Sequence, residues 1–232
     1  MEKQTLDFFL VPLGLCLLLV YHIWLLHQII NHPMTTVIGV NIINKRIWVR
    51  TMMEDAKNGT LAVQTLRNNI MASTVLASTA IMQSSVVTMM MSNPKARTSE
   101  FVFGDQSELG FWIKFLSIFV CFLLAFFFNV QSIRYYSHAS MLINVPVKKM
   151  KSSPELRAEY VGKVVNRGSC FWSLGLRAFY LSLPLYLWLF GPIPMFLCCV
   201  VLVFMLHFLD LTFDFGEGGV GIVDDKDEEA GW

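Results

Sequence analysis

Charged side chains within apolar segments are the residues of this sequence best suited to do chemistry. Arg177 lies inside the apolar run 170–211, which the Gly-Pro-Ile-Pro stretch at 191–194 interrupts. A charged side chain at the centre of a membrane helix costs ~2.5–3.5 kcal/mol, so it needs a partner. If the interruption forms a helical hairpin, Arg177 reaches the level of His207 and Asp210. The sequence therefore predicts an Arg177–Asp210 ion pair, with His207 one turn away on the same face.

Further polar side chains lie at the ends of the other apolar segments and predict one cytoplasm-facing layer. The candidate cluster consists of Arg67, Asn68, Asn69, Arg134, His138, Arg177, His207 and Asp210. Converging ionisable groups in a membrane bundle are a functional-site hypothesis. Because Arg outnumbers carboxylates, the cluster fits an anion or a lipid headgroup better than a metal. The alternative is that these residues are polar only because they lie at a membrane interface.

No recognised catalytic motif accompanies these residues. The sequence contains no HExxH, GxSxG or P-loop pattern and no CxxC pair. His207 and Asp210 share a helix face, but two ligands do not make a zinc site. We therefore expect no metal, no cofactor and no catalytic residue, and we expect a protein that is not an enzyme. A lipid-modifying membrane enzyme is the least supported alternative.

The elements that must position these residues are apolar helices. The chain has 232 residues, of which 55% are hydrophobic and 15% charged, whereas soluble domains carry about 25% charged residues. The predicted fold class is all-α, a polytopic transmembrane helical bundle of about five spans within one domain, residues 1–215. Residues 216–232 are expected to form an acidic, disordered cytoplasmic tail. A net charge of +1 offers no case for nucleic-acid binding.

A helix that crosses the lipid bilayer needs ~20 mostly apolar residues. Five segments of the chain meet this requirement and are predicted as spans, near residues 7–30, 68–91, 111–133, 171–190 and 193–211. The alternative is four spans, with 170–211 forming one kinked helix. This choice decides on which side of the membrane the C-terminus lies.

The Lys and Arg residues between the spans predict the orientation of this multi-pass membrane protein. They concentrate in the loops 31–67 and 134–169, which are therefore expected in the cytoplasm, with the N-terminus outside. The Asn58-Gly59-Thr60 sequon should then stay unmodified. Contact of these basic loops with anionic lipid headgroups is one interpretation of their charge. The other is that the loops only follow the positive-inside bias.

The second predicted span is small and polar rather than strongly apolar. On a helical wheel its small and polar residues form one stripe, made of Asn69, Ser73, Ala77, Ala80, Gln83 and Ser84. Small residues allow close helix packing in membranes. The stripe predicts a central helix that its neighbours shield from lipid. The alternative is a polar path or site between helices.

Four sequence stretches resemble a known family. They are QTLRNNIMAST at 64–74, SIRYYSHASMLIN at 132–144, and RGSCFWSLGLRAFY at 167–180 with LFGPIPM at 189–195. They are similar to a plant and bacterial family of polytopic membrane proteins catalogued only as a domain of unknown function, over about residues 5–215. The resemblance implies a multi-helix membrane protein from a plant, and it implies no activity or catalytic residue.

Two functions compete on this basis. The preferred one is a transporter or channel component in which the basic polar cluster handles a small solute, an anion or a lipid headgroup. A chain of about five spans is short for a transporter, so a homo-oligomer is expected. The alternative is a non-catalytic membrane scaffold or adaptor whose basic loops and acidic tail bind cytoplasmic partners.

Overall fold

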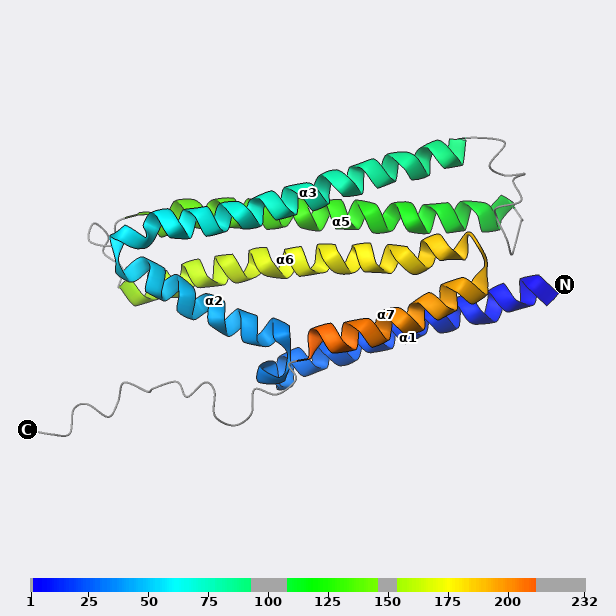
Figure 1. Cartoon of the computed structure of the whole chain (residues 1–232), viewed down its shortest axis with the longest axis horizontal. Coiled ribbons are helices and arrows are strands. Elements are labelled where there is room, and N and C mark those ends of the chain that lie inside the picture. The colour runs from blue at the N-terminus through cyan, green and yellow to red at the C-terminus, as the bar shows by residue number, and fades with distance from the viewer. Residues whose placement is uncertain (1, 93–107, 146–153, 212–232) are drawn as a thin grey trace, which may run out of the picture.

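The computed structural model of the chain describes residues 2–92, 108–145 and 154–211 (Figure 1). Its helices confirm the predicted all-α fold. The α-helices are α1 (Glu2–Asn31), α2 (Val37–Glu54), α3 (Gly59–Ser92), α5 (Glu108–Ile143), α6 (Pro154–Trp188) and α7 (Pro192–Asp210). Two short 3-10 helices, η1 (Pro33–Thr35) and η2 (Ala56–Asn58), flank α2. The acidic tail predicted at 216–232 lies outside the described residues.

Four helices are long and apolar enough to cross a membrane, namely Leu6–Asn31 of α1 together with α3, α5 and α7. These four helices indicate a multi-pass membrane protein. The remaining predicted span, 171–190, lies in the second half of α6, which is not among the four. This half of α6 nevertheless packs between α5 and α7.

Three helices are longer than the predicted spans. α3 begins at Gly59 rather than 68, α5 continues to Ile143 rather than ending at 133, and α6 begins at Pro154 rather than 171. A span that is predicted from hydropathy ends where charged residues begin. A helix, however, continues for as long as one of its faces can be buried against a neighbour. The added turns therefore need a second core outside the apolar part of the bundle. By the apolar part we mean α1, α7 and residues 73–92, 108–131 and 171–188.

A tight turn separates α6 from α7. α6 ends at Trp188, and Gly191 adopts a φ of 130°, which side chains with a Cβ rarely tolerate. Pro192 then starts α7, a position at which its missing N–H is not needed. The alternative of one kinked helix over 170–211 is therefore wrong. The end of α7 lies far from the N-terminus of the chain (Figure 1).

The long helices pack as successive neighbours. α3 lies along α5, α5 along α6, α6 along α7, and α7 along α1 (Figure 1). α1 and α7 run in the same direction, whereas α5 is antiparallel to both α3 and α6. α2 lies against the first half of α6, and a backbone bridge joins Thr36 to Leu211 where α7 ends. The loops at both ends of α2 therefore lie on the same side as the C-terminus of α7.

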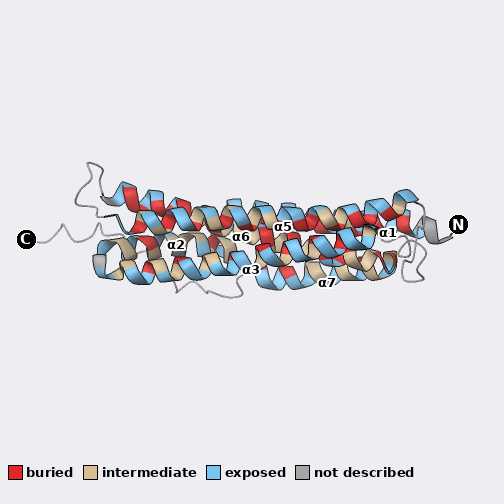
Figure 2. Cartoon of the chain, turned by 90° about the horizontal axis from the view of Figure 1, so that it is seen from above, coloured by how far each residue is buried: buried red, intermediate tan, exposed pale blue. Residues whose placement is uncertain are grey.

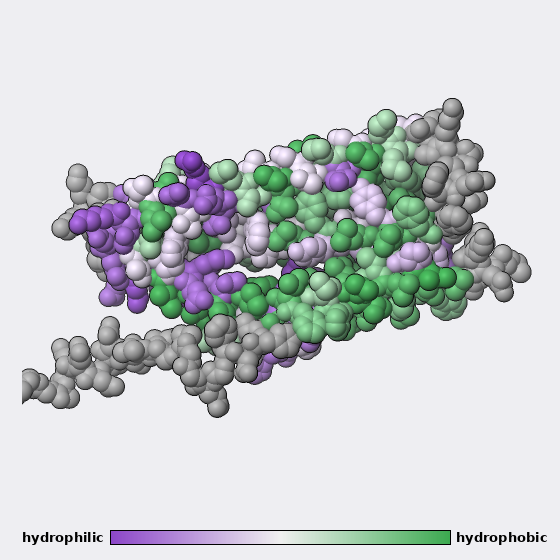
Figure 3. Space-filling view, viewed as in Figure 1, coloured by the Kyte–Doolittle hydropathy of each residue, from purple (hydrophilic) through white to green (hydrophobic). Residues whose placement is uncertain are grey.

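The interior is divided into two main cores (Figure 2). One lies in the apolar part and includes Leu18, Phe115, Ile118 and Met195. The second joins α2, α3, α5 and α6, and its buried members include Val49, Leu66, Tyr136 and Val161. We call the part built around this second core the platform, comprising α2 and residues 59–72, 132–143 and 154–170. In Figure 3 hydrophilic side chains gather over the platform and hydrophobic ones over the apolar part.

The small stripe of α3 is buried against α5. Ser73 and Ala80 are fully buried, and the Ser73 hydroxyl lies 3.2 Å from the hydroxyl of Ser132. The opposite face is exposed, as the predicted wheel requires, and it carries Met71, Val75, Met82, Val86 and Met89. α3 packs almost only on α5, however, so the prediction of a central, shielded helix is wrong. A single buried stripe lets α3 pack against one neighbouring helix, and α3 lies at the edge of the bundle (Figure 1).

Several other hydroxyl groups of α3 bond within their own helix, whereas the buried Ser84 hydroxyl has no partner among the described residues. Thr74, Thr79 and Ser85 each donate to the backbone carbonyl four residues earlier, at 2.8, 2.9 and 3.0 Å. Such bonds remove the need for a partner outside the helix. Lipid can therefore contact the exposed face of this helix although its sequence is polar, because the hydroxyls bonded in this way do not need water.

Enlarging a buried alanine of α3 should destabilise the bundle. Ala80 packs between Ala125 of α5 and Ala178 of α6, and an added isobutyl group must push these helices apart. We expect Ala80→Leu to lower the free energy of unfolding by ~1–3 kcal/mol, measured by reversible unfolding in mixed micelles. Ala72→Leu, on the exposed face, is the matched control and should have little effect. Equal losses for both variants would contradict the edge position of α3.

Candidate functional site

An ion pair joins three helices at the C-terminal end of α7. Arg177 of α6 donates from Nη2 to Oδ1 of Asp210 in α7 at 2.7 Å. Tyr21 of α1 donates its hydroxyl to the other oxygen, Oδ2, also at 2.7 Å. The side chains of Arg177 and Asp210 are only 14% and 11% exposed. The structure therefore contains the ion pair predicted from the hairpin, and Tyr21 completes it.

His207 lies beside this pair without sharing its buried position. The histidine is exposed, and its ring centre lies 5.7 Å from that of Trp24 in α1. Beneath it, Tyr21, Leu25 and Leu206 form a small apolar cluster. His207 thus helps cover the α1–α7 contact rather than bonding to the carboxylate.

Arg177 retains an unused hydrogen-bond donor. Its Nη1 is buried and has no hydrogen-bond partner among the described residues. The side-chain oxygen of Asn129 in α5 is also buried without a partner, while its nitrogen donates to the carbonyl of Ala125. Buried polar atoms of this kind are rare in folded proteins, and they mark places where water or a ligand can bind.

The other residues of the predicted layer lie elsewhere. Ala80 of α3 and Ala125 of α5 lie at the same height along the bundle as Arg177, because both pack on Ala178, the residue after Arg177. At 1.5 Å per residue, Arg67 lies about 20 Å and Arg134 about 13 Å along the bundle from this level. Both arginines are exposed, as are Asn68 and His138, while Asn69 is partly buried. The structure therefore brings Arg177 and Asp210 together but does not place Arg67 or Arg134 level with them.

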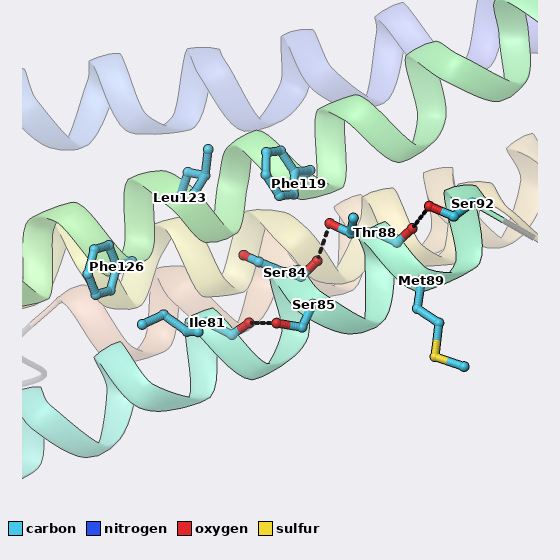
Figure 4. A pocket seen from close by; sticks show the side chains of 9 residues that line it. All are labelled: Ile81, Ser84, Ser85, Thr88, Met89, Ser92, Phe119, Leu123 and Phe126. Atoms are coloured by element: carbon cyan, nitrogen blue, oxygen red, sulfur yellow. Dashed lines mark hydrogen bonds between the residues drawn. The ribbon is translucent and has the colours of Figure 1, made fainter.

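Two well-formed pockets in the described parts of the chain are lined by residues outside the predicted cluster. The first, of about 520 Å³, is a groove between α3 and α5 lined by Ser84, Ser85, Thr88 and apolar residues (Figure 4). Its hydroxyls are mostly bonded along α3, as the dashed lines show. The second, of about 510 Å³, lies between α2 and α6 in the platform. Among the described residues, no three His, Cys, Asp or Glu side chains converge on a metal position.

The sequence analysis missed a second polar group, at the opposite end of the bundle from the platform. Lys114 of α5 is 1% exposed, and its Nζ lies 5.6 Å from the centre of the Trp188 ring. The Trp188 indole donates to Oδ1 of Asp7 at 3.4 Å. A lysine near the start of an apolar helix was the available signal. Charged and aromatic groups of this kind mark the edges of a membrane.

Lys45 was also missed, because nothing in the sequence of α2 pairs it with α6. Its Nζ donates a hydrogen bond to the hydroxyl of Ser169, where α2 crosses α6. The side chain is partly buried, and this burial lowers the pKa of the ammonium group. No carboxylate pairs with Lys45 among the described residues. A partly buried positive charge without a counter-ion is a candidate for binding an anion.

Breaking the ion pair should destabilise the protein strongly. Asp210→Asn leaves Arg177 without a carboxylate, and we expect a loss of about 3 kcal/mol in the free energy of unfolding, because both side chains retain some exposure. Tyr21→Phe removes only one bond to the carboxylate and should cost ~1.5 kcal/mol. His207→Ala, a neighbouring exposed residue, is the control and should change little.

The double variant Arg177→Met with Asp210→Leu should recover most of the stability lost in Asp210→Asn. The two apolar side chains leave no buried charge without a partner. All four proteins would be compared by unfolding in the same detergent micelles. A double variant as unstable as Asp210→Asn would show that the charges themselves are not what destabilises that variant.

Comparison with known proteins identifies a family but no activity. A family described as "Protein of unknown function, DUF599" matches residues 9–215, which is most of the chain. No curated protein and no solved structure matches the chain. The chain therefore belongs to the family described as protein of unknown function, DUF599.

Proposed function

We propose that this protein is a non-catalytic membrane scaffold that holds the platform against one face of a membrane. The observation that carries the proposal is that α3, α5 and α6 continue beyond the apolar part and close, with α2, around a second core. Crossing a membrane requires only about 20 residues per helix, whereas these three helices have 34 to 36. The extra length builds a rigid body with a polar surface, suited to binding partners outside the membrane.

The platform offers a groove suited to a protein segment. Its apolar floor contains Ile43, Ile47 and Leu156, and charged side chains of both signs line it, namely Arg46, Arg50, Glu155 and Glu159. A hydrogen bond from Lys163 lowers the pKa of Glu159, and the charges of Arg46 and Arg50 act in the same direction. Glu159 is therefore ionised at neutral pH. An apolar floor between opposite charges fits an amphipathic segment of a partner protein.

The positions of three arginines favour a scaffold over a transporter. Arg67 and Arg134 lie on the surface of the platform, and Arg177 is held by Asp210. The two pockets described above, in the α3–α5 groove and in the platform, are lined by other residues. The preference drawn from the sequence, a transporter or channel component, therefore becomes the second candidate.

One observation supports that second candidate. Arg177, Asp210 and Tyr21 lie within helices of the apolar part. Nη1 of Arg177 and the side-chain oxygen of Asn129 have no partner within residues 2–92, 108–145 and 154–211. Intramembrane charged groups often mark a substrate or ion pathway. A second conformation that admits water between α6 and α7 would give a solute access to Arg177.

Flux measurements separate the two functions. Purified protein in proteoliposomes should give no efflux of chloride, phosphate or small carboxylates above that of empty liposomes. Insertion and orientation would be checked by protease digestion of the platform. Efflux that Arg177→Ala abolishes, while Arg134→Ala retains it, would replace the scaffold by a transporter.

Photo-crosslinking in native membranes tests the scaffold directly. A photoreactive side chain at Ile47, in the platform groove, should crosslink to one or a few defined proteins. The matched control is the same side chain at Met82, on the lipid-facing side of α3, which should crosslink mainly to lipid. Arg46→Glu with Arg50→Glu should remove the Ile47 crosslinks while the protein stays in the membrane. Crosslinks that persist unchanged in this variant would contradict binding in the groove.

A further inference from the structure

A polar stripe runs along α6 where the apolar part meets the platform. Ser169, Ser173 and Arg177 follow one another at intervals of four residues, which places them on one side of the helix. Ser173 lies one turn from each of the others, about 6 Å along the helix axis. All three residues are partly buried. Figure 3 shows that the surface is hollowed between α6 and the α1–α7 pair near this junction.

Two positive charges lie at this stripe, Lys45 from α2 and Arg177 within the stripe itself, and neither has all its donors paired among the described residues. Lys45 of α2 bonds only to the neutral hydroxyl of Ser169 among the described residues. Arg177 uses Nη2 for Asp210, while its Nη1 is buried without a partner in the part of the chain that the structure describes. Asp210 is the carboxylate bonded at this junction, and Tyr21 already occupies its second oxygen. The site therefore retains one uncompensated positive charge and unused donors.

The level of this site in a membrane follows from the length of α7. Its 19 residues extend about 28 Å, close to the ~30 Å thickness of the hydrocarbon core of a bilayer. Asp210 is the last residue of α7, and Pro192 the first. Asp210 and its partner Arg177 therefore lie at the edge of the hydrocarbon. Phospholipid phosphate groups occupy the adjacent layer.

We propose that Lys45, Ser173 and Arg177 bind the phosphate of an anionic phospholipid headgroup at the junction between α2, α6 and α7. The phosphate lies beside Ser173, accepts hydrogen bonds from Nη1 of Arg177 and from the Ser173 hydroxyl, and pairs with the ammonium group of Lys45. Charge-assisted bonds of this kind are the strongest that a phosphate can form with protein. A lipid headgroup is favoured over free phosphate because the site lies at the edge of the hydrocarbon. This inference does not depend on whether the protein is a scaffold.

Titration of short-chain phosphatidylglycerol into the detergent-solubilised protein, followed by native mass spectrometry, tests the site. We expect one lipid to bind with clear preference over phosphatidylcholine. Lys45→Gln should weaken this binding by about tenfold, as expected for the loss of a charge-assisted contact. Ser173→Asp, which places a carboxylate beside the phosphate, should weaken it further. Arg134→Gln removes the same charge from the exposed platform surface and should leave the affinity within about twofold.

Stability measurements distinguish a binding role of Lys45 from a structural one. In phosphatidylcholine nanodiscs, Lys45→Gln should unfold at the same or a higher temperature than the wild type, because the lysine is desolvated without a counter-ion. Adding phosphatidylglycerol should stabilise the wild type and not the variant. A variant that is equally stabilised by the anionic lipid would overturn the proposal.

Two further outcomes would also overturn it. If Arg134→Gln weakens lipid binding as much as Lys45→Gln, the lipid responds to overall charge rather than to this site. If inorganic phosphate stabilises the wild type in neutral nanodiscs and displaces the lipid, the ligand is a free anion and the headgroup assignment is wrong. The double variant Arg177→Gln with Asp210→Asn removes the guanidinium without leaving a lone carboxylate. It should also weaken lipid binding, which checks the role of Arg177 independently of Lys45.

Discussion

The bond between Arg177 and Asp210 is the interaction on which the arrangement of this protein most depends. α3, α5 and α6 form one group of long helices, and α1 packs on α7 as a second group. The α6–α7 hairpin connects them, and the ion pair closes that hairpin at the end opposite its turn. In surroundings of low polarity, neither charge is stable without the other. The pair therefore sets the register of α7 against α6, and Tyr21 extends this register to α1.

The register of α7 against α6 also determines where the platform lies. Leu211, the residue after Asp210, forms a backbone bridge with Thr36. α2 begins at Val37, the residue after Thr36. The Thr36 side chain caps α2 by accepting a bond from the N–H of Gly39 at 3.2 Å. α2 then crosses the first half of α6, where the Asn166 amide bonds to the carbonyl of Ile42. The position of α7 thus places the element that completes the second core.

Polar groups along the long helices find hydrogen-bond partners in two ways. Along α3, hydroxyls bond to carbonyls of their own helix, so this helix can remain at the edge. Between α5 and α6, polar groups bond across helices, as Ser132 does to the carbonyl of Gly168 at 2.9 Å. Gly175 leaves the room that Asn129 occupies, because a Cβ there would come within 2.5 Å of the amide nitrogen. Small residues and internal bonds together replace the apolar side chains that lipid-facing helices normally carry.

The sequence by itself determined the helical fold, the interruption between α6 and α7 and the pairing of Arg177 with Asp210. These features follow from apolar runs, from the Gly-Pro interruption and from hairpin geometry. Each of them depends only on one helix or on two consecutive helices, and not on how the other helices pack. Only the tertiary structure decided that α3 lies at the edge, that three helices extend into a platform, and that Lys45 meets Ser169. These features depend on which surfaces pack together, and hydropathy along one helix carries no information about the partner it will find. The same reason explains why the eight polar residues do not form one layer: their levels follow from packing at Ala80, Ala125 and Ala178.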